Sequence, residues 1–307
     1  MSGKRTQGLG SHTGRVMTIG LNTFTQLVRM KVFYFLVVFA LIMLGSNFFE
    51  LPQHGLPETF GFGVLRAIMN WSLGAMTLFS MVLAIVATAL LLPRDVEDRT
   101  LYTILAKPVP RIDYLAGKLL GVLLLLAVSL ALMDLLMMVV LHVRMGLFMG
   151  QVDAMAASGR MAAEDLAQMR AELLANGPDG SLQGAVAAVF LRAAVMTALT
   201  LFISTFSTST LFTSIVSFLV YFIGYFQADM RQVFLHTVGE GTGMLERGTA
   251  LVITLVLPDF QMFNVIDAVI EGAAMPLAVL GKLALLSGFH VAIYLVASWY
   301  VFADKEV

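Results

Sequence analysis

The sequence has no cysteine and very little charge. Of its 307 residues, 59% are hydrophobic and only 13% are charged, whereas about 25% of the residues in a soluble domain are charged. Without cysteine, the chain has no disulfide, no thiolate metal ligand and no thiol nucleophile. This length would otherwise suggest two soluble domains of about 150 residues each. The chain has too few polar residues to cover the surfaces of two such domains. The composition therefore predicts a polytopic membrane protein.

The sequence also lacks the charge imbalance and the motifs that would point to nucleic-acid binding or catalysis. Its 19 basic and 20 acidic residues give a formal net charge of −1, which provides no basic surface for nucleic acid. It contains no GxxxxGK[ST], HExxH or GxSxG motif, and its five histidines are scattered singly. We predict that the chain is not an enzyme and binds no metal or cofactor directly.

Apolar stretches predict the fold. A transmembrane helix needs about 20 mainly apolar residues, and six stretches approach this length, so we predict an all-α bundle of six transmembrane helices over residues 32–303. The predicted spans are Val32–Phe49, Trp71–Leu92, Leu119–Leu141, Ala185–Phe206, Thr210–Phe226 and Leu283–Ala303. A further run, Gly248–Leu257, is too short to span and ends at Pro258, so we interpret 248–258 as a re-entrant or interfacial piece.

Lysine and arginine predict the orientation. Eleven of the 19 basic residues fall in the N-terminal region, the loop after the second span and the C-terminal tail, and such residues favour the cytoplasmic side. Residues 1–31 and 304–307 are therefore predicted to be cytoplasmic, and segments 142–184 and 227–282 extracytoplasmic. Within 142–184, the stretch from Asp153 to Leu174 is predicted to be helical.

The N-terminal region predicts an amphipathic helix. Residues 1–14 are rich in glycine, serine and threonine, which is typical of an irregular segment. From Val16 onward, apolar residues recur at helical spacing, while Asn22, Thr25 and Arg29 take the other side. We interpret this as a helix lying in the cytoplasmic interface. The alternative is a cytoplasmic extension of the first span.

The loop at 93–118 is short and densely charged, with both signs present. Acidic residues favour the first turn of a helix and Pro108 ends one, so a helix is predicted from Asp95 to Ala106. Such a helix beside the membrane could receive force from a soluble partner. A solvated cytoplasmic turn fits the same residues.

The loop resembles the permease subunits of type-2 ATP-binding-cassette (ABC) exporters. That family shows an acidic residue, a threonine, a leucine, a Pro-x-Ser/Thr-Arg turn and a Gly-Lys pair. The matching residues here are Glu97, Thr100, Leu105, Pro108, Arg111 and Gly117-Lys118, while Pro110 and Arg99 depart from the pattern. Further resemblance lies in Leu21-Asn22-Thr23-Phe24 with Arg29, in Ser204-Thr205-Phe206-Ser207, and in Leu257-Pro258-Asp259-Phe260 with Phe263-Asn264.

The resemblance implies half of an exporter in a bacterial inner membrane. Two permease copies, identical or different, would form the translocation path within the lipid, and each would engage a separate ABC ATPase that binds ATP and magnesium. The interfacial helix, with Asn22, Phe24 and Arg29, would lie against the ATPase. The coupling residues would be Asp95, Glu97, Arg99, Thr100, Leu105, Pro108, Arg111 and Lys118.

Polar residues inside the predicted spans are candidates for a functional role. Asp134 lies near the middle of the third predicted span, where it could line the transport path or a dimer interface, or could accept structural hydrogen bonds. Arg192 could extend outward or pair with Asp134. One alternative function is an ion-coupled carrier in which Asp134 and His290 relay protons. Another is a membrane scaffold that anchors a soluble complex.

Overall fold

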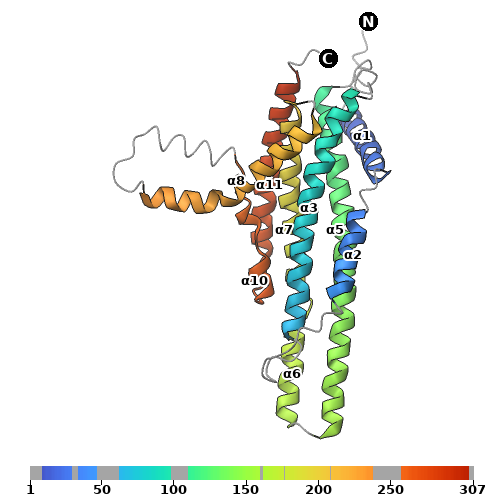
Figure 1. Cartoon of the computed structure of the whole chain (residues 1–307), viewed down its shortest axis with the longest axis vertical. Helices are drawn as coiled ribbons and strands as arrows, with labels where there is room; N and C mark the ends of the chain where they lie inside the picture. Colours follow the sequence, from blue (N-terminus) through green and yellow to red (C-terminus); the bar gives the residue numbers. More distant parts are fainter. Residues whose placement is uncertain are drawn as a thin grey trace.

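The structure is a computed structural model that describes residues 9–29, 34–46, 62–97, 110–159, 162–175, 177–207, 209–237 and 257–303. These residues form helices and contain no strand (Figure 1). The helices are α1 (Leu9–Arg29), α2 (Tyr34–Ser46), α3 (Phe62–Glu97), α5 (Arg111–Ser158), α6 (Ala163–Ala175), α7 (Gly180–Ser204), α8 (Thr210–Thr237), the 3-10 turn η2 (Gln261–Phe263), α10 (Ile266–Ile270) and α11 (Leu277–Ala303).

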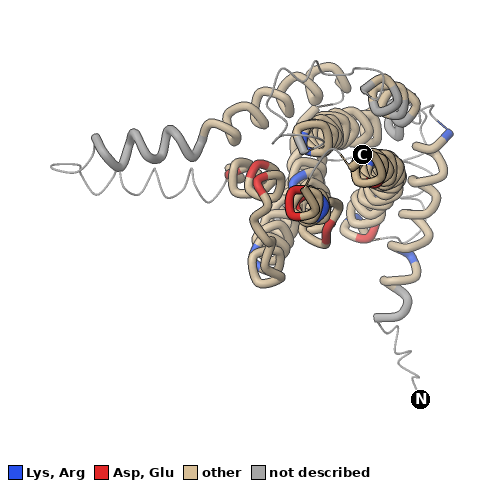
Figure 2. Tube along the Cα trace, turned by 90° about the horizontal axis from the view of Figure 1, so that it is seen from below, with Lys and Arg blue, Asp and Glu red and all other residues tan. Residues whose placement is uncertain are grey.

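The predicted all-α polytopic bundle is confirmed. Four segments are long and apolar enough to cross a membrane: Gly63–Pro93, Arg111–Ser158, Ala163–Ser204 and Leu277–Ala303. Each of the other two predicted spans also falls on a helix, α2 and α8, but only 13 residues of the first are described as helical. The long helices run side by side in Figure 1, and Figure 2 shows how few residues along the trace are charged.

The core consists of two clusters of buried side chains stacked along the bundle. One cluster lies toward the end where α5 begins and α11 ends, and includes Tyr114, Leu115 and Phe302. The other lies toward the opposite end and includes Phe39 and Met137. In a bilayer, side-chain packing of this kind is a main source of attraction between helices, because lipid tails are as apolar as the side chains.

α5 extends far beyond the predicted span Leu119–Leu141. It has 48 residues, a length of about 72 Å at 1.5 Å per residue, more than twice the ~30 Å hydrocarbon core. Its final turns form a hairpin with α6, so the helical stretch predicted from Asp153 to Leu174 is interrupted at Gly159 and divided between two helices. The chain turns at Gly159, whose φ of 62° is the left-handed conformation that glycine adopts readily.

The hairpin is held by an apolar strip and one ion pair. Leu166 and Leu173 of α6 are buried in the same cluster as Phe148 and Val152 of α5, and Arg170 pairs with Asp153. The turn at Gly159 could therefore be predicted only with knowledge of the packing between α5 and α6.

α1 is a separate helix packed on the first turns of α5. It begins at Leu9, so the expectation of an irregular segment is wrong for residues 9–14. α1 and α2 are tilted in different directions in Figure 1, so α1 is not a straight extension of the first span. The face with Gly20, Thr23 and Leu27 is buried, which shows that the predicted apolar side packs against protein.

Two glycines four residues apart allow this contact. A Cβ atom on Gly117 would lie 2.6 Å from the Cβ of Ile19, and one on Gly121 would lie 2.6 Å from the Cβ of Thr23 and 2.8 Å from the carbonyl oxygen of Gly20. Small residues at this spacing let helix backbones approach closely in membranes. Gly117, which the sequence analysis read as part of a Gly-Lys pair, therefore serves helix packing.

Gly121→Ala is expected to lower stability because its methyl group would force α1 away from α5. Overpacking of this kind costs about 1–3 kcal/mol, which a fall in the thermal unfolding midpoint of the detergent-purified chain would report. The matched control is Gly146→Ala on the same helix, where a Cβ would meet nothing within 4 Å. Equal midpoints for the two variants would contradict the close contact between α1 and α5.

Candidate functional site

The predicted coupling segment lies largely outside the described residues. Helix α3 continues through Pro93 to Glu97, so the backbone of Asp95 and Glu97 is helical and belongs to the end of α3. Their side chains, and the whole of Arg99, Thr100, Leu105 and Pro108, lie outside the described part. Their coupling role, and the helix predicted from Asp95 to Ala106, stay predictions.

Arg111 joins the start of α5 to the end of α11. Its Nη1 donates hydrogen bonds of 2.6 Å to the carbonyl oxygens of Phe302 and Ala303, and its guanidinium lies 5.8 Å from the centre of the Phe302 ring. The last carbonyls of a helix have no partner within the helix, and a cation there is also favoured by the helix dipole. Arg111 therefore has a structural contact within the chain.

Asp113 joins the start of α5 to α1. Its carboxylate accepts a hydrogen bond of 2.9 Å from Nδ1 of His12 and lies 3.3 Å from Nε of Arg15. The Asp113 side chain is only 6% exposed, so the hydrogen bond from His12 and the charge of Arg15 offset the cost of burying it. The sequence analysis missed this cluster, although an acidic residue in the first turn of a helix was a visible signal.

Lys118 lies deeper in the same junction. It is buried, and its Nζ lies 5.7 Å from the centre of the Tyr114 ring, within the range of a cation–π contact. The Tyr114 ring stacks on Phe302 of α11, with ring centres 6.1 Å apart. We call the contacts of α1, the start of α5 and the end of α11 the junction.

The predicted residues of the interfacial helix divide between two faces of α1. Phe24 is half-buried and packs against the core cluster, whereas Asn22 and Arg29 are exposed. The exposed pair is placed where a soluble partner could reach it. Its contact with an ATPase stays a prediction.

Asp134 and Arg192 do not pair with each other. Asp134 accepts a hydrogen bond of 3.1 Å from Nε2 of Gln183, in the first turns of α7, whereas Arg192 donates to the hydroxyl of Tyr221 on α8. Gln183 and Arg192 are nine residues apart on α7, about 13 Å along its axis. Asp134 is therefore level with the beginning of α7 instead of the middle of the bundle, and the predicted pairing is wrong.

Arg192 is a buried charge at the midpoint of α7. It stands twelve residues from Gly180 and twelve from Ser204, the ends of the helix, about 18 Å from either. Its side chain is turned into the bundle and only 4% of the residue is exposed. It does not extend outward to the membrane surface, contrary to one of our two predictions.

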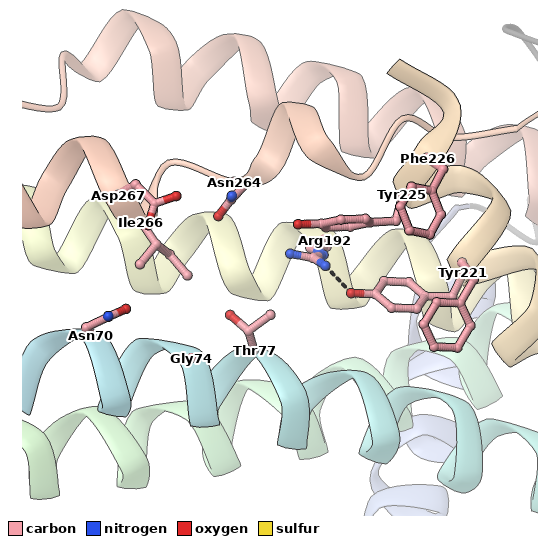
Figure 3. A pocket seen from close by; sticks show the side chains of 11 residues that line it. Asn70, Gly74, Thr77, Arg192, Tyr221, Tyr225, Phe226, Asn264, Ile266 and Asp267 are labelled. Carbon is pink, nitrogen blue, oxygen red and sulfur yellow. Dashed lines mark hydrogen bonds between the residues drawn. The ribbon is translucent and has the colours of Figure 1, made fainter. Parts of the chain in front are cut away.

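Arg192 lines a pocket of about 410 Å³ formed by four parts of the chain (Figure 3). The helices α3, α7 and α8 supply most of its wall, and the segment after η2 closes it. The lining residues are Asn70, Gly74, Thr77, Arg192, Tyr221, Phe222, Tyr225, Phe226, Asn264, Ile266 and Asp267. A volume of this size suits a small molecule or a lipid head group.

The segment from Leu257 to Asn264 brings one side of this pocket into place. Its Phe260 and Phe263 are buried in the core, and the Phe260 amide donates a 3.2 Å hydrogen bond to the Gly224 carbonyl of α8. A Cβ on Gly224 would lie 2.7 Å from the Pro258 carbonyl oxygen, so glycine permits this approach. Of the predicted re-entrant run 248–258, residues 248–256 lie outside the described part of the chain.

A metal site is not part of this arrangement. In the described ranges, no group of three or more histidine, aspartate or glutamate residues is placed to hold a metal ion. The groups brought together are instead one guanidinium, aromatic rings, amides, hydroxyls and a carboxylate. They are suited to recognition of a polar or charged group more than to bond-breaking chemistry.

The helical bundle with its apolar spans defines a polytopic membrane protein. A family model described as "ABC-2 family transporter protein" matches residues 17–307. The chain therefore belongs to the ABC-2 transporter family and is a transmembrane permease. A comparison with curated proteins finds no match.

Arg111→Gln is expected to loosen the end of α11, because glutamine is too short to reach both carbonyl oxygens that the guanidinium binds. Hydrogen exchange followed by mass spectrometry would show faster exchange in the last turn of α11 and unchanged exchange at its beginning. Arg29→Gln on the exposed face of α1 is the matched control and is expected to leave α11 unchanged. Equal exchange in the two variants would refute the joining role of Arg111.

Proposed function

We propose that the chain is the membrane subunit of an ATP-driven exporter and works as a dimer with a separate ABC ATPase. In this proposal the ATPase binds ATP and magnesium, and the permease supplies the path through a bacterial inner membrane. The chain's own family supports a transport role. The observation that carries the rest is the junction, where α1, α5 and α11 are tied together at one end of the bundle.

The junction is suited to receiving a movement of the ATPase and passing it to the transmembrane helices. In Figure 1 the beginning of α5, the end of α11 and α1 lie at the same end of the bundle. We place this end in the cytoplasm, in agreement with the distribution of basic residues. An ATPase that moved α1 would also move α5, because Asp113 and the two glycines couple these helices.

The length of α5 would carry that movement to the other end. A continuous helix is stiff over this distance, with only gentle curvature expected. α5 contacts α2, α3, α6, α7 and α11 along its length. We therefore propose that α1, α5 and α11 move as one body when the ATPase subunits close on ATP.

The contacts of the other polar candidates support an exporter over an ion-coupled carrier. Nδ1 of His290 donates to the Leu286 carbonyl oxygen of its own helix at 2.9 Å, as expected of a structural histidine. The carboxylate of Asp134 is held by the Gln183 amide. The two side chains have separate partners, so these contacts provide no proton relay between them.

Purification of the tagged full chain from its native membranes in a mild detergent tests the proposal. We expect an ABC ATPase subunit to co-purify and ATP hydrolysis to follow it. Glu97→Gln combined with Arg99→Gln is expected to reduce the recovered ATPase about tenfold, the loss corresponding to about 1.4 kcal/mol of binding free energy.

The matched control removes charges at the opposite end of the bundle. Glu164→Gln combined with Arg170→Gln on α6 is expected to leave ATPase recovery unchanged. Recovery of no ATPase with the unaltered chain would contradict the proposed function. Equal loss in both double variants would contradict the assignment of the coupling segment to the 93–118 loop.

A further inference from the structure

The strongest unexplained feature of the molecule is the charge of Arg192. A guanidinium stays protonated in proteins, and placing a charge in a membrane interior is costly unless the charge is paired. Among the described residues, Arg192 forms no ion pair; its hydrogen bond goes to the neutral hydroxyl of Tyr221. Within the described part of the chain, the positive charge is therefore buried without a carboxylate partner.

Two donors at the pocket have no hydrogen-bond partner in the described part of the chain. They are Nε of Arg192 and Oγ1 of Thr77, and both atoms are fully buried. A buried polar group without a partner costs about 1–3 kcal/mol. Both residues line the same pocket, one from α7 and the other from α3, so one acceptor group placed between them could satisfy both.

Aromatic rings hold the guanidinium in position. Its Cζ lies 5.3 Å from the centre of the Tyr221 ring and 5.7 Å from that of Tyr225, and Figure 3 shows the side chain directed toward these two rings. Such cation–π contacts attract the guanidinium without neutralising its charge. The planar donor set that remains matches a phosphate or carboxylate group.

The pocket extends along α3 from Asn70 to Thr77. Asn70 at one end of it is next to Trp71, which is 65% exposed, and tryptophan concentrates at membrane interfaces. Thr77 is seven residues further along α3, about 10 Å deeper. With Trp71 placed at an interface, Thr77 and Arg192 lie nearer the middle of the membrane, and a lipid head group would reach them from the side of the bundle.

The wall of the pocket is apolar on one side and polar on the other. Phe222 and Phe226 on α8 are 55% and 54% exposed, so they offer a surface over which an acyl chain could lie. Asn264 and Asp267 belong to the opposite wall, and in Figure 3 Asn264 lies between Asp267 and Arg192. No ion pair of Asp267 is present in the described part.

We propose that this pocket binds an amphiphile with a zwitterionic head group. Its phosphate would accept hydrogen bonds from Arg192 and Thr77, its ammonium group would face Asp267, and its acyl chain would lie over Phe222 and Phe226. A head group of this kind neutralises both charges of the pocket, whereas a purely anionic one would leave the carboxylate uncompensated. If this amphiphile is also the transported substrate, that role rests on the proposed exporter function. The binding of the amphiphile to the pocket does not depend on that function.

Equilibrium binding of radiolabelled lipids to the purified permease, without any ATPase, tests the site. Phosphatidylethanolamine is expected to bind with about one molecule per chain and more tightly than phosphatidylglycerol, and a cationic lipid is expected not to bind. Arg192→Gln is expected to weaken phosphatidylethanolamine binding at least tenfold. The control Arg66→Gln, on the exposed surface of α3, is expected to change it less than twofold.

Asp267→Asn tests the second half of the head group. It is expected to weaken phosphatidylethanolamine binding several-fold and to strengthen phosphatidylglycerol binding, which reverses or removes the preference. Tighter binding of phosphatidylglycerol by the unaltered chain, with no effect of Asp267→Asn, would overturn the zwitterionic assignment. Displacement of the lipid by millimolar inorganic phosphate would assign the pocket to a free anion and overturn the lipid assignment.

Thr77→Val provides a second test of the site if the Arg192→Gln variant does not fold. The substitution nearly preserves shape and removes a buried hydroxyl that has no partner, so the unfolding midpoint of the lipid-free chain is expected to stay level or rise. Phosphatidylethanolamine binding is expected to weaken about threefold or more. Unchanged binding would overturn the site. Lipid binding without ATPase co-purification would overturn only the exporter function.

Discussion

The contact between α1 and the first turns of α5 is the constraint on which one end of the molecule depends, the end where α5 begins and α11 ends. Gly117 and Gly121 allow the two backbones to approach so closely that even one methyl group would collide. The polar contacts of Asp113 with His12 and Arg15 lie across the same pair of helices, and Arg111 joins the start of α5 to the end of α11. Together they join parts of the chain that are about 100 to 190 residues apart in sequence.

The second constraint is the cost of charge in an apolar interior. The chain has little charge to begin with, and at the junction each buried charge described has an opposite charge, a carbonyl oxygen or an aromatic ring beside it. Arg192 is different because its partners are a neutral hydroxyl and aromatic rings. Because the charges of the junction have partners within the chain, the junction is suited to moving as one unit. Arg192 has no anionic partner in the described part of the chain, so its pocket is suited to binding and releasing an anionic group.

The sequence was sufficient to predict the class of fold and the approximate positions of the spans, because apolar composition alone determines which segments can cross a bilayer. It was not sufficient for the length of α5. The outer part of that helix contains Arg144, Gly146 and Gly150, which weaken the hydrophobic signal, and it is stabilised by packing against α6. The hairpin turn depends on the same packing.

The interaction partners of the polar residues were even harder to predict from the sequence than the length of α5. The spacing of Gly117 and Gly121 was visible in the sequence as a small-xxx-small pattern, yet nothing in it named α1 as the partner helix. Asp134 and Arg192 were identified individually, but their partners depend on how α7 is rotated and how far it is displaced along α5. The Leu257–Asn264 segment was recognised by resemblance, while its role in building the pocket follows only from its contact with α8.

In the proposed exporter, α1 and α5 move together when the ATPase subunits close on ATP. Because the chain has no cysteine, spin labels can be attached at introduced cysteines, and pulsed electron paramagnetic resonance can measure the distances between them. With a non-hydrolysable ATP analogue, the account predicts an unchanged distance between Met17→Cys on α1 and Val128→Cys on α5, and a changed distance between Gly14→Cys in the two copies of a dimer. A changed distance within the chain, with a constant distance between the copies, would contradict it.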